Sequence, residues 1–260
     1  MLYWLKMDKK GFSNIFFVFL IALAFIFYIA PIYLKLNSEP IKPQGIGADA
    51  IKLINSYDVV EDFKIYLEKS AELSSCQAFY DHTKNGGYFE NKCGKENGYN
   101  KWDVNCNPFN NLESDYKKYF DREFKQYFQT TASYIYSFDD GNFIGATESK
   151  VEKSFDGIRY FVSPTFRIKP DFDLKIYSEI NNKIEENINC FSDTEKSPDL
   201  CIKEDNWNME RKGKLIFFDI KTDTKCIIKD GNEFKEDNAN IKFIRDFTKK
   251  DLLATENLLG

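Results

Sequence analysis

One uncharged stretch, Ile15–Leu34, constrains this chain more than any other feature. It is twenty residues long, and as an α-helix it would extend about 30 Å, the thickness of the hydrocarbon core of a bilayer. Lys6, Lys9 and Lys10 precede it against a single acid, Asp8, and the positive-inside rule keeps such a basic end in the cytoplasm. We therefore expect a basic cytoplasmic stub at residues 1–14, an uncleaved transmembrane anchor at 15–34, and the rest of the chain outside the cell membrane.

Two kinds of N-terminal processing are alternatives to a static anchor. A cleavable signal peptide would have an apolar region of about 7–15 residues and a small-x-small cleavage site, whereas this run is longer and Ile29-Ala30-Pro31 fits such a site poorly. The segment Lys9-Lys10-Gly11-Phe12-Ser13 resembles the processing site of type IV prepilins, which are cut after the glycine. The resemblance implies cleavage between Gly11 and Phe12 and a hydrophobic helix that packs into a filament.

The chain departs from the prepilin pattern in two places. Phe16 stands where a glutamate is expected, at the fifth position of the mature chain. In pilins the helix usually runs on into the globular head, whereas here Pro40 and Pro43 interrupt it, because proline lacks the donor N–H and restricts the residue before it.

All six cysteines lie after the predicted anchor, and an even number in an outward-facing domain indicates a disulfide framework. Six cysteines allow fifteen pairings. Proximity across Gly-, Asn- and Pro-rich loops favours Cys93 with Cys106 and Cys190 with Cys201, which leaves Cys76 for Cys226. A zinc site is the competing interpretation, but the chain has no Cys-x-x-Cys and a single histidine, His82. Free buried thiols are the other alternative.

The segments after the anchor predict an α+β domain. A linker at 35–45 leads into a domain at 46–247 and a flexible tail at 248–260. A long amphipathic helix is expected from Gly47 to His82, with Leu53, Tyr57, Val60, Phe63, Leu67, Ala71 and Ala78 on one apolar stripe. Further helices are expected at Leu112–Ser137, where Tyr116, Phe120, Phe124 and Phe128 form an aromatic stripe, and at Asp171–Asn189. Antiparallel strands are expected at Phe143–Thr147, Lys150–Phe155, Ile158–Ile168, Leu215–Lys221, Thr224–Lys229 and Asn240–Phe247.

The sequence offers no recognisable catalytic, cofactor-binding or metal-binding motif. The chain carries a net charge of −5, and −7 after Leu34, so a nucleic-acid partner is not expected. No serine nucleophile elbow or phosphate-binding loop occurs, and Asp139, Asp140 and Asn142 lack EF-hand spacing. His82 follows Asp81 at the predicted helix end, where we expect a C-terminal cap that interacts with the helix dipole.

The order of features is similar to a group of N-terminally anchored archaeal envelope proteins. The residues that carry the resemblance are Tyr66, Ser70-Ala71, Asn85-Gly86-Gly87, Cys93-Gly94, Trp102, Cys106, Ser163-Pro164-Thr165-Phe166, Cys190 and Cys201. It covers most of residues 45–247 and implies an accessory or structural role in the envelope.

Three hypotheses for function follow. The first is a non-enzymatic, single-pass surface protein whose outward domain binds another protein or assembles with copies of itself, without a cofactor. The second is a pilin-like filament subunit processed after Gly11. The third is an envelope hydrolase that uses two carboxylates, which would require a deep cleft holding two acids of raised pKa.

Overall fold

The computed structural model describes most of the chain after the linker. The described residues are Ile21, Leu23, Phe27 and Tyr28 and the ranges 46–90, 93–103, 106–128, 132–155, 157–231 and 233–247. None of them belongs to a helix that is long and apolar enough to cross a membrane. Most of the predicted anchor, and the candidate processing site at Gly11 and Phe12, fall outside the described residues.

The chain divides into two compact units, Met1–Ser56 and Tyr57–Gly260. Helix α2 (Ile46–Lys84) begins in the first unit and supplies the first element of the second. The other helical elements of the second unit are η1 (Phe109–Asn111), α3 (Leu112–Tyr127), α4 (Ile176–Glu186), α5 (Ile188–Ser192) and η2 (Pro198–Leu200).

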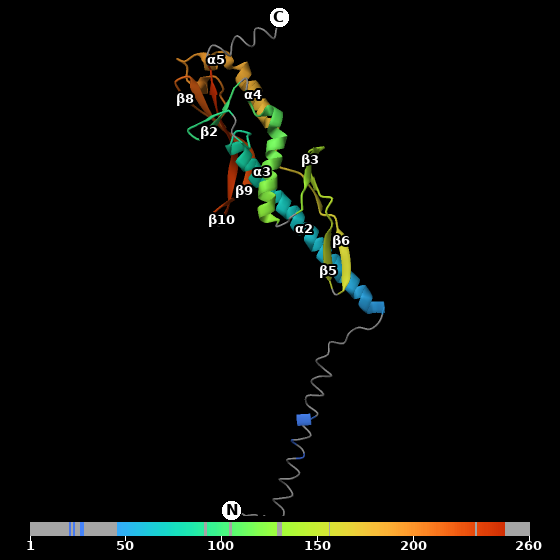
Figure 1. Ribbon diagram of the computed structural model, residues 1–260. Helices are drawn as coiled ribbons and strands as arrows, with labels where there is room; N and C mark the ends of the chain where they lie inside the picture. Colours follow the sequence, from blue (N-terminus) through green and yellow to red (C-terminus); the bar gives the residue numbers. More distant parts are fainter. Residues whose placement is uncertain are drawn as a thin grey trace, which may run out of the picture. The chain divides into compact units, whose positions relative to one another are not determined.

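The second unit is mixed α and β, and nearly all of its strand pairs are antiparallel (Figure 1). Its strands are β1 (Lys95–Glu96), β2 (Tyr99–Trp102), β3 (Ile135–Asp139), β4 (Asn142–Ala146), β5 (Val151–Phe155), β6 (Ile158–Val162), β7 (Thr165–Ile168), β8 (Trp207–Lys212), β9 (Leu215–Asp230) and β10 (Glu233–Asp246). Among the described residues they form sheets in the orders β1-β2-β10-β9-β8, β3-β4-β7 and β5-β6. The exception to the antiparallel pairing is β2, which runs parallel to β10.

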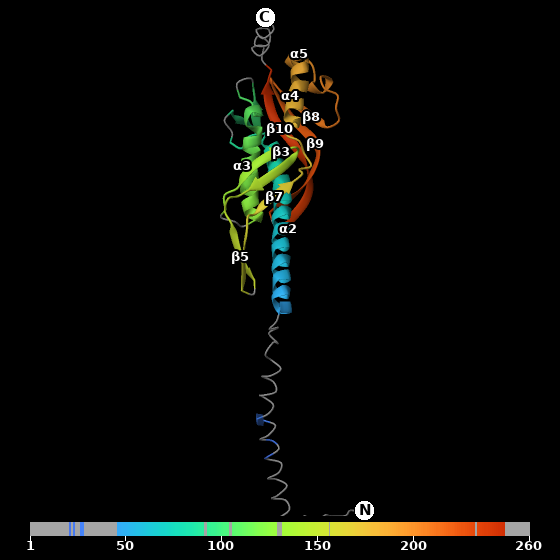
Figure 2. The ribbon, with the colours of Figure 1, turned by 90° about the vertical axis from the view of Figure 1, so that its right-hand side faces the viewer.

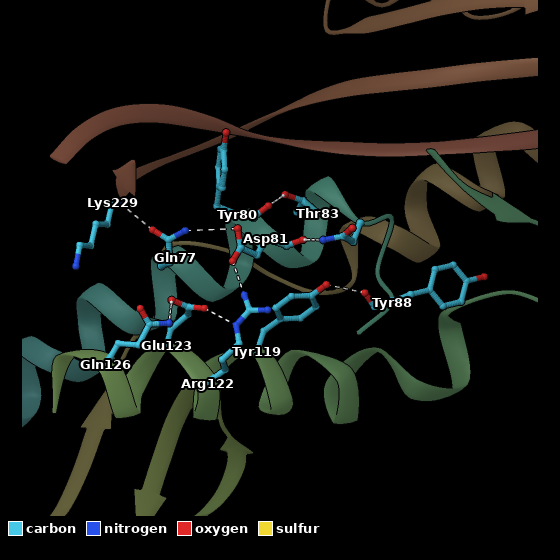
Figure 3. Close-up of polar contacts among 11 residues, drawn as sticks. Gln77, Tyr80, Asp81, Thr83, Tyr88, Tyr119, Arg122, Glu123, Gln126 and Lys229 are labelled. Carbon is cyan, nitrogen blue, oxygen red and sulfur yellow. Dashed lines mark hydrogen bonds and ion pairs between the residues drawn. The ribbon is translucent and has the colours of Figure 1, made fainter. Parts of the chain in front are cut away.

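The C-terminal half of α2 packs between the β9–β10 ribbon and α3, as Figures 1, 2 and 3 show from different directions. Its residues Leu67, Ala71, Ala78 and Phe79 are buried in the core. The small side chains at two of these positions let neighbouring elements approach the helix closely. A disulfide joins Cys76 of α2 to Cys226 of β9, so the helix is covalently fixed to the sheet.

All six cysteines are paired. Besides Cys76–Cys226, the structure joins Cys93 to Cys106 and Cys190 to Cys201, the same pairs that loop proximity favours in the sequence. The second and third bonds close short loops, whereas the first links residues 150 positions apart. In the chain-entropy description, such a long loop restricts the unfolded chain most.

Aromatic side chains fill the core on both sides of α2. The predicted stripe of α3, formed by Tyr116, Phe120, Phe124 and Phe128, is buried throughout. On the sheet side, the rings of Trp102 and Phe243 stack with their centroids 3.6 Å apart.

Several predicted elements differ from the structure. The helix expected at Leu112–Ser137 ends at Tyr127. The aromatic pattern then changes to a two-residue period that begins just before β3 and continues through it. Tyr134, Tyr136 and Phe138 are half-buried, and Ile135 and Ser137 between them are exposed. The helix expected at Asp171–Asn189 begins only at Ile176. The two strands expected at Leu215–Lys221 and Thr224–Lys229 are one strand, β9, and its partner β10 begins well before the expected Asn240.

Helix α2 ends in a Schellman motif, in which the N–H groups of Gly86 and Gly87 donate to the carbonyls of Thr83 and His82. Gly86 has a φ of +61°, in the left-handed region. A Cβ at this position would lie 2.7 Å from the backbone oxygen of Lys242. This glycine therefore serves both the helix end and its contact with the sheet.

We expect Gly86→Ala to reduce the free energy of unfolding by about 3 kcal/mol, because left-handed strain and a backbone clash add together. Gly98→Ala is the matched control, since Gly98 also has a positive φ but a Cβ there would meet open space. The control should lose about 1 kcal/mol. Urea unfolding followed by tryptophan fluorescence measures both losses, and equal losses would contradict the role assigned to the Lys242 contact.

Candidate functional site

A cluster of charged side chains joins α2 to α3 (Figure 3). Arg122 of α3 donates from Nη2 to Asp81 of α2 at 2.6 Å, and from Nε to Glu123 of its own helix at 2.6 Å. One guanidinium therefore holds two carboxylates. It also lies 4.9 Å above the ring of Tyr119.

Glutamine side chains complete this cluster. Gln77 donates from Nε2 to Asp81 at 3.4 Å, and its Oε1 accepts from the backbone N–H of Lys229 in β9 at 2.8 Å. Gln126 donates to Glu123 at 3.1 Å. The network thus connects α3, α2 and β9 through polar atoms (Figure 3).

Both acids of the cluster have raised pKa values. Burial raises the pKa of the Asp81 carboxyl and that of the Glu123 carboxyl, and the Arg122 guanidinium opposes both shifts. A hydrolase would need such a pair to face a common cleft. The groove along the outer face of α3, of about 1320 Å³, is lined by Arg122 and by neither carboxylate. The arrangement therefore acts as a clamp between two helices.

His82 lies at the centre of the core and is completely buried. Its Nδ1 is 2.9 Å from the hydroxyl of Tyr177, and its Nε2 has no hydrogen-bond partner among the described residues. Burial lowers the pKa of His82 from 6.5 to about 4, an effect that the Asp115 carboxylate only partly opposes. At neutral pH the ring is uncharged and its Nδ1 contacts the Tyr177 hydroxyl, which differs from the expected C-terminal cap that interacts with the helix dipole.

The remaining sequence candidates occupy structural positions. Asp139, Asp140 and Asn142 form the turn between β3 and β4, where Asn142 donates to the backbone oxygens of both aspartates. No cluster of three or more His, Cys, Asp or Glu side chains in the described ranges is arranged to hold a metal ion.

Large apolar side chains are exposed on α2. In the first unit these are Ile51, Leu53 and Ile54, and in the second unit Tyr57, Ile65 and Tyr66, each more than half exposed. Tyr57 precedes the buried Ala71 by about four turns and lies on nearly the same face of the helix. The apolar stripe predicted from Leu53 to Ala78 is therefore covered only over its C-terminal part.

Sequence reasoning missed two features of this region. The pairing of Asp81 with Arg122 joins positions 41 residues apart, and no local spacing signals it. The exposure of Ile65 could have been predicted from the helical periodicity, because this isoleucine lies off the stripe that faces the core.

In comparisons with protein-family models, with curated proteins and with solved structures, nothing matches this chain. Its function must therefore be inferred from its own geometry.

We expect the stability of the protein to fall as the pH is lowered from 6.5 to 4, in part through His82. The folded protein protonates this ring only near pH 4 and the unfolded chain near pH 6.5, so the unfolded chain binds more protons in between. The contribution amounts to about 3 kcal/mol.

His82→Leu tests this expectation, because His82 is the only histidine of the chain. Its unfolding free energy should fall less than that of the native chain, by about 3 kcal/mol between pH 7 and pH 4. Asp81 and Glu123, whose raised pKa values act in the opposite direction, are present in both chains and cancel. Urea unfolding across this pH range gives the comparison, and parallel curves would show that His82 makes no such contribution.

Proposed function

We propose that this chain is a non-enzymatic, membrane-anchored surface protein that assembles with copies of itself through the exposed apolar residues of α2. The anchor is the uncharged stretch Ile15–Leu34, and the domain that follows lies outside the cell membrane. The three disulfides support this location, since disulfides persist in oxidising compartments.

The single observation that carries the proposal is the exposure of large apolar side chains on one helix. In the second unit, Tyr57, Ile65 and Tyr66 are spread over about half the circumference of α2. In the first unit, Ile51, Leu53 and Ile54 are spread over a similar arc. A helix that is apolar on several faces is normally buried among other helices, and exposed apolar patches mark interaction surfaces.

A second copy of the chain is the partner that this surface favours. Each copy carries the same apolar helix, so helices from several copies can cover one another's faces in a bundle. The charged residues along this part of α2 form exposed ion pairs of i, i+3 spacing, such as Lys64 with Glu61, which add little to stability by themselves. Apolar contact is therefore the main driving force for association.

A pilin-like filament subunit is the second candidate. The observation that favours it is that α2 carries apolar residues at its N-terminal end while its C-terminal end is packed against an antiparallel sheet. It requires cleavage after Gly11, which the first candidate does not.

We expect Ile54→Glu together with Ile65→Glu to abolish self-association of the full-length chain in a nonionic detergent, because charged side chains would have to be buried between helices. Ile135→Glu together with Leu200→Glu is the matched control, since it adds the same two negative charges at exposed apolar positions outside α2. Sedimentation velocity measures the association, and thermal unfolding shows that both variants fold.

Association of the isoleucine variant at native strength would overturn the proposal. The mass of the native protein isolated from its membrane separates the two candidates. A chain that retains Met1 supports the static anchor, and a chain that begins at Phe12 supports the filament subunit.

A further inference from the structure

An open groove follows the outer face of α3, separate from the exposed apolar residues of α2. It has a volume of about 1320 Å³. The helix supplies its floor from Glu113 to Lys125, about 18 Å along the axis. Phe89 and Phe109 line the groove. Tyr134, which directly precedes β3, and Tyr136, which lies in β3, also line it.

The lining of this groove is cationic although the chain as a whole is acidic. Five basic side chains and two acidic ones line it, on a chain of net charge −5. The basic residues are Lys117, Lys118, Arg122, Lys125 and Lys175.

Two of these cations lie above acidic partners that are largely buried. The Lys118 side chain is 49% exposed and its partner Asp115 is 11% exposed. Arg122 is 46% exposed and its partner Glu123 is 8% exposed. For these pairs the solvent therefore meets positive charge before it meets negative charge.

These cations can turn toward a ligand at low cost. Lys125 pairs with Asp121 four residues away on the same helix, and such a solvent-accessible pair contributes at most about 1 kcal/mol. Lys118 also lies 5.7 Å above the ring of Phe89, so its stem already rests on the wall of the groove.

Aromatic side chains also line the groove. The Tyr134 ring lines the groove, while its hydroxyl is buried and has no hydrogen-bond partner among the described residues. Tyr136 donates its hydroxyl to Asp121 at 2.9 Å, which fixes its ring beside the helix. The groove thus combines aromatic side chains with a row of positive charges.

We infer that this groove binds an acidic polysaccharide, a polymer that carries one carboxylate on each sugar. The aromatic rings offer the flat apolar surfaces against which sugar rings pack, and the cations pair with the carboxylates. The open form suits a long chain better than an enclosed small molecule.

A nucleic acid fits this groove less well. Its phosphates carry charge at high density, and a binding domain for them normally has a basic face that is not offset by nearby acids. Here Asp81, Asp115 and Glu123 lie directly under the cations. A polymer of lower charge density therefore matches the groove better.

Calorimetric titration of the full-length chain with polygalacturonate tests this inference. Lys117→Gln with Lys118→Gln and Lys125→Gln should weaken binding about tenfold or more, and raising the salt should weaken binding of the native chain. Arg122 is left in place because it holds the clamp between α2 and α3.

The matched control replaces Lys196, Lys212 and Lys225 by glutamine. These lysines are also exposed and ion-paired, but they lie outside the groove. The control should bind within about twofold of the native chain, and the neutral polymer dextran should not bind. Equal loss in the two triple variants, no binding of polygalacturonate by the native chain, or tighter binding of an oligothymidylate would each overturn the inference.

Discussion

The packing of the C-terminal half of α2 between the β9–β10 ribbon and α3 is the interaction on which the rest of the structure depends. Leu67, Ala71 and Ala78 bury one face of the helix, and Cys76–Cys226 fixes it to the sheet. The clamp of Asp81 and Arg122 fixes it to α3. Because α4 reaches the same helix through Tyr177 and His82, three parts of the domain are aligned on one element.

This packing also explains why two surfaces are left for partners. The cover of α2 is incomplete on its N-terminal side, so Tyr57 and Ile65 are exposed although the helix continues unbroken through them. Helix α3 directs its aromatic stripe inward to α2 and to β3-β4-β7, so its charged side chains form the groove on the outside. One surface is apolar and the other cationic, and they suit different partners.

The sequence predicts those parts of the fold that rest on local pattern. The aromatic stripe of α3 repeats every four residues and is buried, and α2 ends within two residues of the expected His82. The disulfides Cys93–Cys106 and Cys190–Cys201 can be predicted because their cysteines are close in sequence. Cys76 and Cys226 are then the remaining pair. Strand β8 was missed because it lies in a segment that also carries the Cys190–Cys201 loop and short turns.

The sequence does not predict what depends on three-dimensional environment. The neutral state of His82 follows from its complete burial by Tyr116, Tyr119 and Tyr177, which no neighbouring residue signals. The exposure of Leu53 and Tyr57 depends on how far the sheet and α3 extend along α2. The periodicity of apolar residues in the sequence does not predict that distance. The candidate interaction surfaces therefore emerge only from the folded chain.

Hydrogen exchange along α2 of the full-length protein, measured where the protein is monomeric and where it is associated, shows whether the exposed part of this helix is covered by a second copy. We expect the amides of residues 57–66 to exchange slowly only in the associated state, and those of residues 71–83 to be protected in both states. Exchange at residues 57–66 that is unchanged by association would contradict self-association through α2. A protein that stays monomeric at every concentration would contradict it as well.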